Sequence, residues 1–300
     1  MYETTTSADG LQVPILINAL HSQMDAGHVA SIISDHLLDS LQHERIATFD
    51  VDSLVDFRKH RPVMTFENWR FTEYSEPQIA LELLSDDEGR PLLLLHGQEP
   101  DLRWHSFVSE LVSIVESYGV TTTISVQGIP MGLPHTRPAH LSLHATESEM
   151  IGSQPEIFGT MQVPGHVSGL LELRLGEKGH RAAGIAAGVP HYLSSSPYSP
   201  AAAAAVRKIA QLGELALPIG DLEASSAQLL REIAEQVDGQ EEVQAIVHAL
   251  ERQYDSFAQT QAHLTGSAEE PLPTADEIGA AAEAFLADLG SFGPDDSEQS

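Results

Sequence analysis

Polar side chains follow four apolar stretches of the sequence, which end near residues 17, 95, 126 and 189. Carboxylate, guanidinium, imidazole, amide and aromatic groups recur at these points, and together they supply the chemistry of a polar ligand site. The residues are Asn18, Glu99, Asp101, Arg103, Trp104, His135, Arg137, His191 and Tyr192. If the four stretches are parallel strands, their carboxyl ends lie at one edge of a sheet, where open α/β sheets bind ligands. We therefore predict a ligand-binding cleft at that edge.

A purely structural interpretation of the same residues stays open. Glu99 or Asp101 can form an ion pair with Arg137, and the histidines can satisfy carbonyl groups of loops. The sequence also lacks the nucleotide-binding patterns GxGxxG and GxxxxGK[ST], the zinc-protease pattern HExxH and the hydrolase pattern GxSxG. We expect no catalytic residue.

The serines that follow His191 suggest a hydrolytic nucleophile at first sight. However, residues 194–196 lie in a loop of several residues, whereas such a nucleophile needs a strained elbow, a base and an orienting acid. Ser199 and Pro200 are typical of the start of a helix, which the five alanines after them continue. We interpret these serines as turn and cap residues.

Fifteen histidines raise the question of a metal site. His28, His36 and His43 share one side of a predicted helix, but their spacing separates them by roughly 11–12 Å along its axis. Zinc–nitrogen bonds are about 2 Å long, so two of these residues cannot share one metal. The chain has no cysteine, which excludes disulfides and thiolate ligands. We expect no metal and no cofactor.

The stretches around the polar residues alternate between strand and helix patterns over the first 220 residues. We predict strands at 13–20, 45–51, 70–74, 79–84, 91–97, 120–126, 140–146 and 181–189, and helices at 28–42 and 102–119. Residues 70–74 and 79–84 flank a proline-containing turn and are predicted to pair as an antiparallel hairpin. Such alternation is typical of an α/β fold, whose sheet is here mixed and covered by helices.

The C-terminal part of the chain is different. Residues 221–300 contain 18 acidic and two basic residues, and their apolar positions predict two successive helices separated at Asp238 and Gly239. A further helix is predicted to start at Thr274. We predict an α/β core at residues 1–220, an acidic helical region at 221–290 and a disordered tail at 291–300.

The charge of −29 argues against nucleic acids and anionic membranes as partners, since both would repel this chain. No apolar run approaches the roughly 20 residues needed to span a membrane. The first residues carry no Lys or Arg before an apolar stretch, as a secretory signal would. We expect a cytoplasmic protein.

Three segments in order, HGQEPDLRWHSF (96–107), GIPMGLPHTRP (128–138) and GIAAGVPHYL (184–193), resemble the proteasome assembly chaperone 2 family in its bacterial branch. The resemblance covers about residues 10–220. It implies a three-layer α/β/α sandwich like that of nucleoside phosphorylases, a helical C-terminal extension, and self-association, with a trimer as the expected form.

The resemblance also implies a non-catalytic role as a chaperone or scaffold in protein assembly, with this chain itself and another protein as partners. Relatives that dock onto the proteasome often end in a hydrophobic residue, Tyr and one final residue. This chain ends in DDSEQS, so we do not expect docking by that route. The phosphorylase-like fold leaves one alternative open, a small-molecule-binding protein or an enzyme that uses the predicted cleft.

Overall fold

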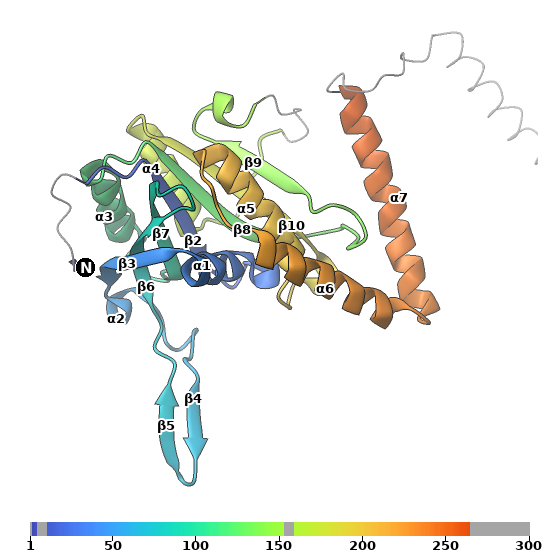
Figure 1. Cartoon of the computed structure of the whole chain (residues 1–300), viewed down its shortest axis with the longest axis horizontal. Helices are drawn as coiled ribbons and strands as arrows, with labels where there is room; N and C mark the ends of the chain where they lie inside the picture. The colour runs from blue at the N-terminus through green and yellow to red at the C-terminus, as the bar shows by residue number, and fades with distance from the viewer. Residues whose placement is uncertain (1, 5–10, 153–158, 265–300) are drawn as a thin grey trace, which may run out of the picture. The chain divides into compact units, whose positions relative to one another are not determined.

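The computed structural model describes residues 2–4, 11–152 and 159–264 (Figure 1). The chain divides into two units, residues 1–255 and residues 256–300. The first unit contains the whole sheet and all helices up to the middle of the last described one. In the second unit, the structure describes residues 256–264, which form the C-terminal end of the last helix.

Eight strands form the main sheet of the described chain, in the order β1-β3-β6-β7-β2-β8-β10-β9. They are β1 (Tyr2–Thr4), β2 (Ile15–His21), β3 (Gln42–Phe49), β6 (Ile79–Ser85), β7 (Pro91–Gln98), β8 (Thr122–Met131), β9 (Leu141–Ala145) and β10 (Arg181–Pro190). Five of them run in the same direction, namely β2, β3, β7, β8 and β10. The prediction of a mixed, mostly parallel sheet is confirmed.

The helices follow the strands along the chain. They are α1 (Val29–Ser40), α2 (Val51–Leu54), α3 (Trp104–Ser117), α4 (Val167–Glu177), α5 (Ser199–Gly213), α6 (Gly220–Val237) and α7 (Glu241–Leu264). Short 3₁₀ turns occur at Ala26–His28, Ser148–Met150 and His191–Leu193. No helix of the described residues is both long and apolar enough to cross a membrane.

Each face of the sheet has its own apolar core, because successive residues of a strand point to opposite faces. In β2, Ile15 and Ile17 belong to the core that α1, α5 and α6 cover. Leu16 and Leu20 of the same strand belong to the core that α3 and α4 cover. Helices therefore lie on both faces, and the three-layer α/β/α sandwich is confirmed.

The predicted hairpin between residues 70–74 and 79–84 is wrong. Residues Arg70–Tyr74 form β5, which pairs with β4 (Met64–Glu67) in a separate two-stranded sheet. Asn68 and Trp69 turn the chain between them, both with positive φ, as a two-residue hairpin turn requires. The strand at Ile79–Ser85 instead enters the main sheet between β3 and β7.

Two helices follow the core, as the apolar spacing predicts. α6 ends at Val237, and Gly239 has a φ of 81° before α7 begins. Leu222 and Ile233 of α6 pack into the same core as α1 and α5. The predicted helix at Thr274 and the tail at 291–300 lie outside the described residues, and the domain boundary at residue 220 stays a prediction.

Candidate functional site

The strands that precede the predicted site residues are neighbours in the sheet. β7, β2, β8 and β10 are adjacent and parallel, so their carboxyl ends lie at the same edge. The structure nevertheless divides the nine predicted residues into three groups, each with hydrogen-bond partners of its own. Asn18, Glu99 and Trp104 lie toward the N-terminus of α4. Asp101 and Arg103 lie at the start of α3, and His135, Arg137, His191 and Tyr192 lie near α7.

In the first group, Asn18 is fully buried and connects the sheet to α4. Its Nδ2 donates to Oγ of Ser125 on β8 at 3.1 Å and to Oγ of Ser168 on α4 at 3.0 Å. Its Oδ1 accepts the backbone N–H of Leu20 at 3.3 Å. A buried amide needs such partners, because an unsatisfied polar group in the core is costly. Asn18 therefore fixes the positions of two serine hydroxyls.

The N-terminus of α4 receives two further acceptors. Glu99 Oε1 accepts the backbone N–H of Val167 at 2.6 Å, and Nδ1 of His166 accepts that of Gly169 at 3.1 Å. Both bonds satisfy N–H groups that have no partner within the helix. Burial lowers the pKa of His166, so this imidazole is held in its neutral form. Trp104 donates from Nε1 to the carbonyl oxygen of Pro100 at 2.6 Å.

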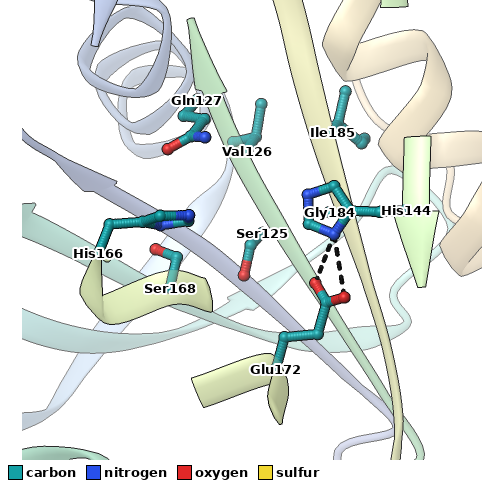
Figure 2. A pocket seen from close by; sticks show the side chains of 9 residues that line it. All are labelled: Ser125, Val126, Gln127, His144, His166, Ser168, Glu172, Gly184 and Ile185. Atoms are coloured by element: carbon teal, nitrogen blue, oxygen red, sulfur yellow. Dashed lines mark hydrogen bonds and ion pairs between the residues drawn. The ribbon is translucent and has the colours of Figure 1, made fainter. Parts of the chain in front are cut away.

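A small pocket lies beside these groups, between α4 and the strands β8, β9 and β10 (Figure 2). It is lined by nine residues, six of which have polar side chains, namely Ser125, Val126, Gln127, His144, His166, Ser168, Glu172, Gly184 and Ile185. Figure 2 shows that the polar side chains come from both sides of the pocket, His144 from β9, and Ser168 and Glu172 from α4 with His166 directly before it. Polar groups that converge on one hollow are typical of a ligand site.

His144 and Glu172 form an ion pair across this pocket. Nδ1 of His144 lies 2.9 Å from the Glu172 carboxylate, and this hydrogen bond raises the pKa of His144. The imidazole lies against Gly184 of β10, where an added Cβ would be 2.0 Å from Cε1 of His144. Gly184 therefore lets the ring lie against the backbone of β10.

In the second group, Asp101 binds the loop that follows α2. It accepts from the backbone N–H of Asp56 at 3.0 Å, from Nζ of Lys59 at 2.9 Å and from Nε2 of His60 at 3.1 Å. These bonds hold the pKa of Asp101 below its usual range although burial opposes them. Arg103 directly precedes α3 with a φ of 56°. Asp101 is occupied as a structural acceptor.

In the third group, Tyr192 and His135 bind each other. The Tyr192 hydroxyl accepts the backbone N–H of His135 at 2.9 Å and lies 2.8 Å from its Nδ1, while burial lowers the pKa of His135. The ring of His191 packs edge-on against Tyr192 with centroids 5.3 Å apart. Ser194 Oγ donates to the carbonyl oxygen of His191, in agreement with a turn residue.

Arg137 pairs with α7 and not with Glu99 or Asp101. Its Nε and Nη2 each lie 2.8 Å from a carboxylate oxygen of Asp255, and its Nη1 lies 3.1 Å from Glu251. Arg137 therefore does form an ion pair, as the structural interpretation of the sequence proposes. Its acidic partners, however, lie on a helix more than 100 residues later in the chain.

None of the nine residues predicted for the site lines this pocket. Ser125 and His144 lie inside predicted strands, but their side chains can be grouped only once β8, β9 and β10 are known to be neighbours. Residues 167–177 were not assigned to any element, so Ser168 and Glu172 had no position. An (i, i+4) pair of Ser168 and Glu172 was the available signal, and it is weak.

Comparisons with known proteins agree with this architecture. The sequence model of the PAC2 family matches residues 19–237. The structure of Mycobacterium tuberculosis Rv2714, a protein of unknown function, has a TM-score of 0.84 at 40% identity and covers 88% of this chain and 92% of its own.

Two further structures carry functional descriptions. The proteasome-assembly chaperone homologue Rv2125 of M. tuberculosis has a TM-score of 0.69 at 26% identity and covers 78% of this chain and 99% of its own. The Pyrococcus furiosus proteasome activator PbaB has a TM-score of 0.58 at 15% identity over 79% of this chain and 98% of its own, and shows the fold alone. No curated protein matches the chain.

Proposed function

Because the chain belongs to the PAC2 family, we propose that it is a self-associating, non-catalytic cytoplasmic protein with a chaperone-like role in protein assembly. The description of Rv2125 as a proteasome-assembly chaperone homologue supports this role at 26% identity. The partners are further copies of this chain, a trimer being the form that the family resemblance implies, and the subunits whose assembly it assists.

One observation carries the self-association. The hairpin of β4 and β5 extends away from the main sheet (Figure 1) and exposes a row of large apolar side chains. They are Val63, Met64, Phe66, Trp69, Phe71 and Tyr74, with Trp69 93% exposed. Such contiguous apolar surface marks sites of protein–protein contact.

The charge of the hairpin favours a second copy as its partner. Arg61 and Arg70 balance Glu67 and Glu73, so this segment has no net charge in a chain that carries −29. Two copies repel each other over most of their surfaces, and the repulsion is smallest where they meet through a neutral, apolar segment.

Sedimentation of the full chain at several concentrations tests this proposal. We expect a species larger than the 32.4 kDa protomer, and a monomer for the triple variant Phe66→Ser, Trp69→Ser, Phe71→Ser. The control variant Met161→Ser, Val163→Ser changes two other exposed apolar residues and keeps the oligomer. A wild-type chain that stays monomeric at every concentration would refute self-association.

The chaperone-like role has its own test. Proteasome core subunits are the first clients to examine, because Rv2125 is described as a proteasome-assembly chaperone homologue. Native mass spectrometry of the chain mixed with unassembled core subunits is expected to show a complex that disappears once assembly is complete. Unchanged assembly kinetics and no complex would remove the basis for this role.

A further inference from the structure

A groove lies between the helices α6 and α7 and the loop that follows β8. Its volume of about 540 Å³ is typical of binding pockets, and it is open to solvent on one side, where Ala234, Glu235 and His248 are exposed. Its floor is apolar. Val247 of α7 is buried although it belongs to neither core of the sheet, and Val237 of α6 is half-buried. The groove therefore offers apolar surface that a partner can contact.

The wall that α6 contributes to the groove is acidic. Glu235 and Asp238 line the groove, and neither side chain has a hydrogen-bond or ion-pair partner among the described residues. A third carboxylate, Glu251 of α7, already binds Arg137. No Lys or Arg occurs among the described residues that line the groove. Two negative charges thus lie beside apolar surface, and no cation of the described chain is paired with them.

The C-terminal end of α6 adds to this negative charge. The helix ends at Val237, and its last turn contains no basic residue. Helix C-termini carry a partial negative charge, which Lys or Arg usually offsets and which Glu235 and Asp238 instead increase. Residues 220–255 as a whole contain nine acidic and two basic residues. A cation bound at this point interacts favourably with both carboxylates and with the helix end.

These features select the kind of occupant. Pockets usually bury about 70–90% of a small ligand, which a groove open on one side cannot do, whereas one face of a protein segment can lie in it. A second copy of this chain is disfavoured because it brings the same excess of acidic residues. Nucleic acids and anionic membranes are repelled for the same reason. The charge therefore favours a basic segment, and the floor favours one that also has an apolar face.

We propose that the groove between α6, α7 and the loop after β8 is a docking site for a basic amphipathic segment of another protein. Apolar side chains of the segment contact Ala234, Val237 and Val247, and a Lys or Arg beside them binds Glu235 and Asp238. The site is separate from the β4–β5 hairpin. The proposal does not rest on self-association or on a role in protein assembly.

Fluorescence anisotropy with labelled synthetic peptides tests this proposal on the full chain. The probe KLAKKLAKLAK carries leucines on one helical face and lysines on the opposite one. Two matched peptides replace its lysines by glutamate or its leucines by serine. We expect saturable binding of the probe that weakens as salt is added, no binding of the glutamate peptide, and at least about tenfold weaker binding of the serine peptide. Equal binding of the probe and the serine peptide, or no saturable binding of the probe, would overturn the proposal.

Variants locate the binding in the groove. Glu235→Gln combined with Asp238→Asn removes both unpaired carboxylates and is expected to raise the dissociation constant of the probe about fivefold or more. Ala234→Arg, at an exposed position of α6, places a cation beside the same carboxylates and is expected to weaken the binding as well. The control Asp52→Asn combined with Glu149→Gln removes two exposed carboxylates elsewhere and leaves the constant unchanged. A folded Glu235→Gln, Asp238→Asn variant that binds as tightly as the wild type, or a control that weakens the binding equally, would contradict docking in this groove.

Discussion

Arg137 and Asp255 form a two-pronged ion pair, with both nitrogen–oxygen distances at 2.8 Å, between the loop after β8 and helix α7. Glu251 adds hydrogen bonds to Arg137 and to Thr136, and Tyr254 donates to the carbonyl oxygen of Pro138 at 3.2 Å. These polar contacts attach residues 241–255 of α7 to the loop that carries His135.

Arg137→Ala is expected to loosen this attachment without unfolding the core. The pair is partly exposed, so the amide hydrogen exchange of residues 241–255 should rise by roughly two- to fivefold, and less at high salt. Arg174→Ala, which removes an exposed pair within α4, is the control and leaves α7 unchanged. Exchange in α7 that is the same in both variants would show that Arg137 does not hold the helix.

Asp25 makes the stability of the fold depend on pH. This buried carboxylate accepts from the N–H of Gly128 at 2.7 Å and of Ala30 at 3.0 Å, yet burial raises its pKa from 3.8 to about 6. The folded chain thus holds the Asp25 proton more tightly than the unfolded chain. This contribution to folding is complete below pH 3.8 and is lost as the pH rises through 6.

The two pKa values correspond to about 3 kcal/mol in the free energy of unfolding. The chemical shift of the Asp25 carboxyl carbon is expected to titrate near pH 6 in the folded chain. An Asp25 midpoint below pH 4 would contradict the predicted pH dependence.

Gly184→Ala is expected to displace His144 and to destabilise the fold by about 1–3 kcal/mol, because the new methyl group would overlap the imidazole. Urea unfolding measures this cost. Combining Gly184→Ala with His144→Ala should restore most of the loss, since the overlapping ring is then absent. Gly220→Ala has free space around it and is the control. A double variant as unstable as Gly184→Ala alone would mean that another neighbour causes the strain.

Glu172→Gln is expected to lower the pKa of His144, because the hydrogen bond to the Glu172 carboxylate is what raises it. In the wild type, this pair stabilises the fold fully below pH 6.5 and loses its effect as the pH rises through the raised pKa of His144. NMR titration of the imidazole measures both values, with His144 of a Glu177→Gln variant as the control. Equal pKa values in the Glu172→Gln variant and the wild type would show that the ion pair does not form in solution.

Periodicity predicts much of this fold because several strands in the middle of the sheet contain buried apolar runs. The apolar residues 92–95 lie in β7 and are buried on both faces of the sheet. The side chains of β2 point alternately to the two faces and so belong to both cores. Periodicity fails for residues 79–85, where the partner of a strand is decided by the whole sheet and not by the turn before it. The short strand β4 is mostly exposed, and its two apolar residues, Met64 and Phe66, make an alternation too short to identify a strand.

The candidate site could be predicted only in part, for a related reason. Residue types at strand ends point to the edge of the sheet, where Asn18 and Glu99 bond to Ser168 and Val167 at the start of α4, but neither lines the pocket. Two residues that do line it, His144 and Glu172, meet because the antiparallel edge strand β9 lies beside α4. That contact joins residues 28 positions apart, and no local pattern encodes it.

The β4–β5 hairpin hydrogen-bonds only within itself as a sheet, and the main sheet passes from β3 to β6 without it. Changes at its tip therefore leave the register of every strand in the core untouched. With the proposed role of this hairpin as the contact surface, substitutions around Asn68 and Trp69 would change the partner without changing the fold of the core.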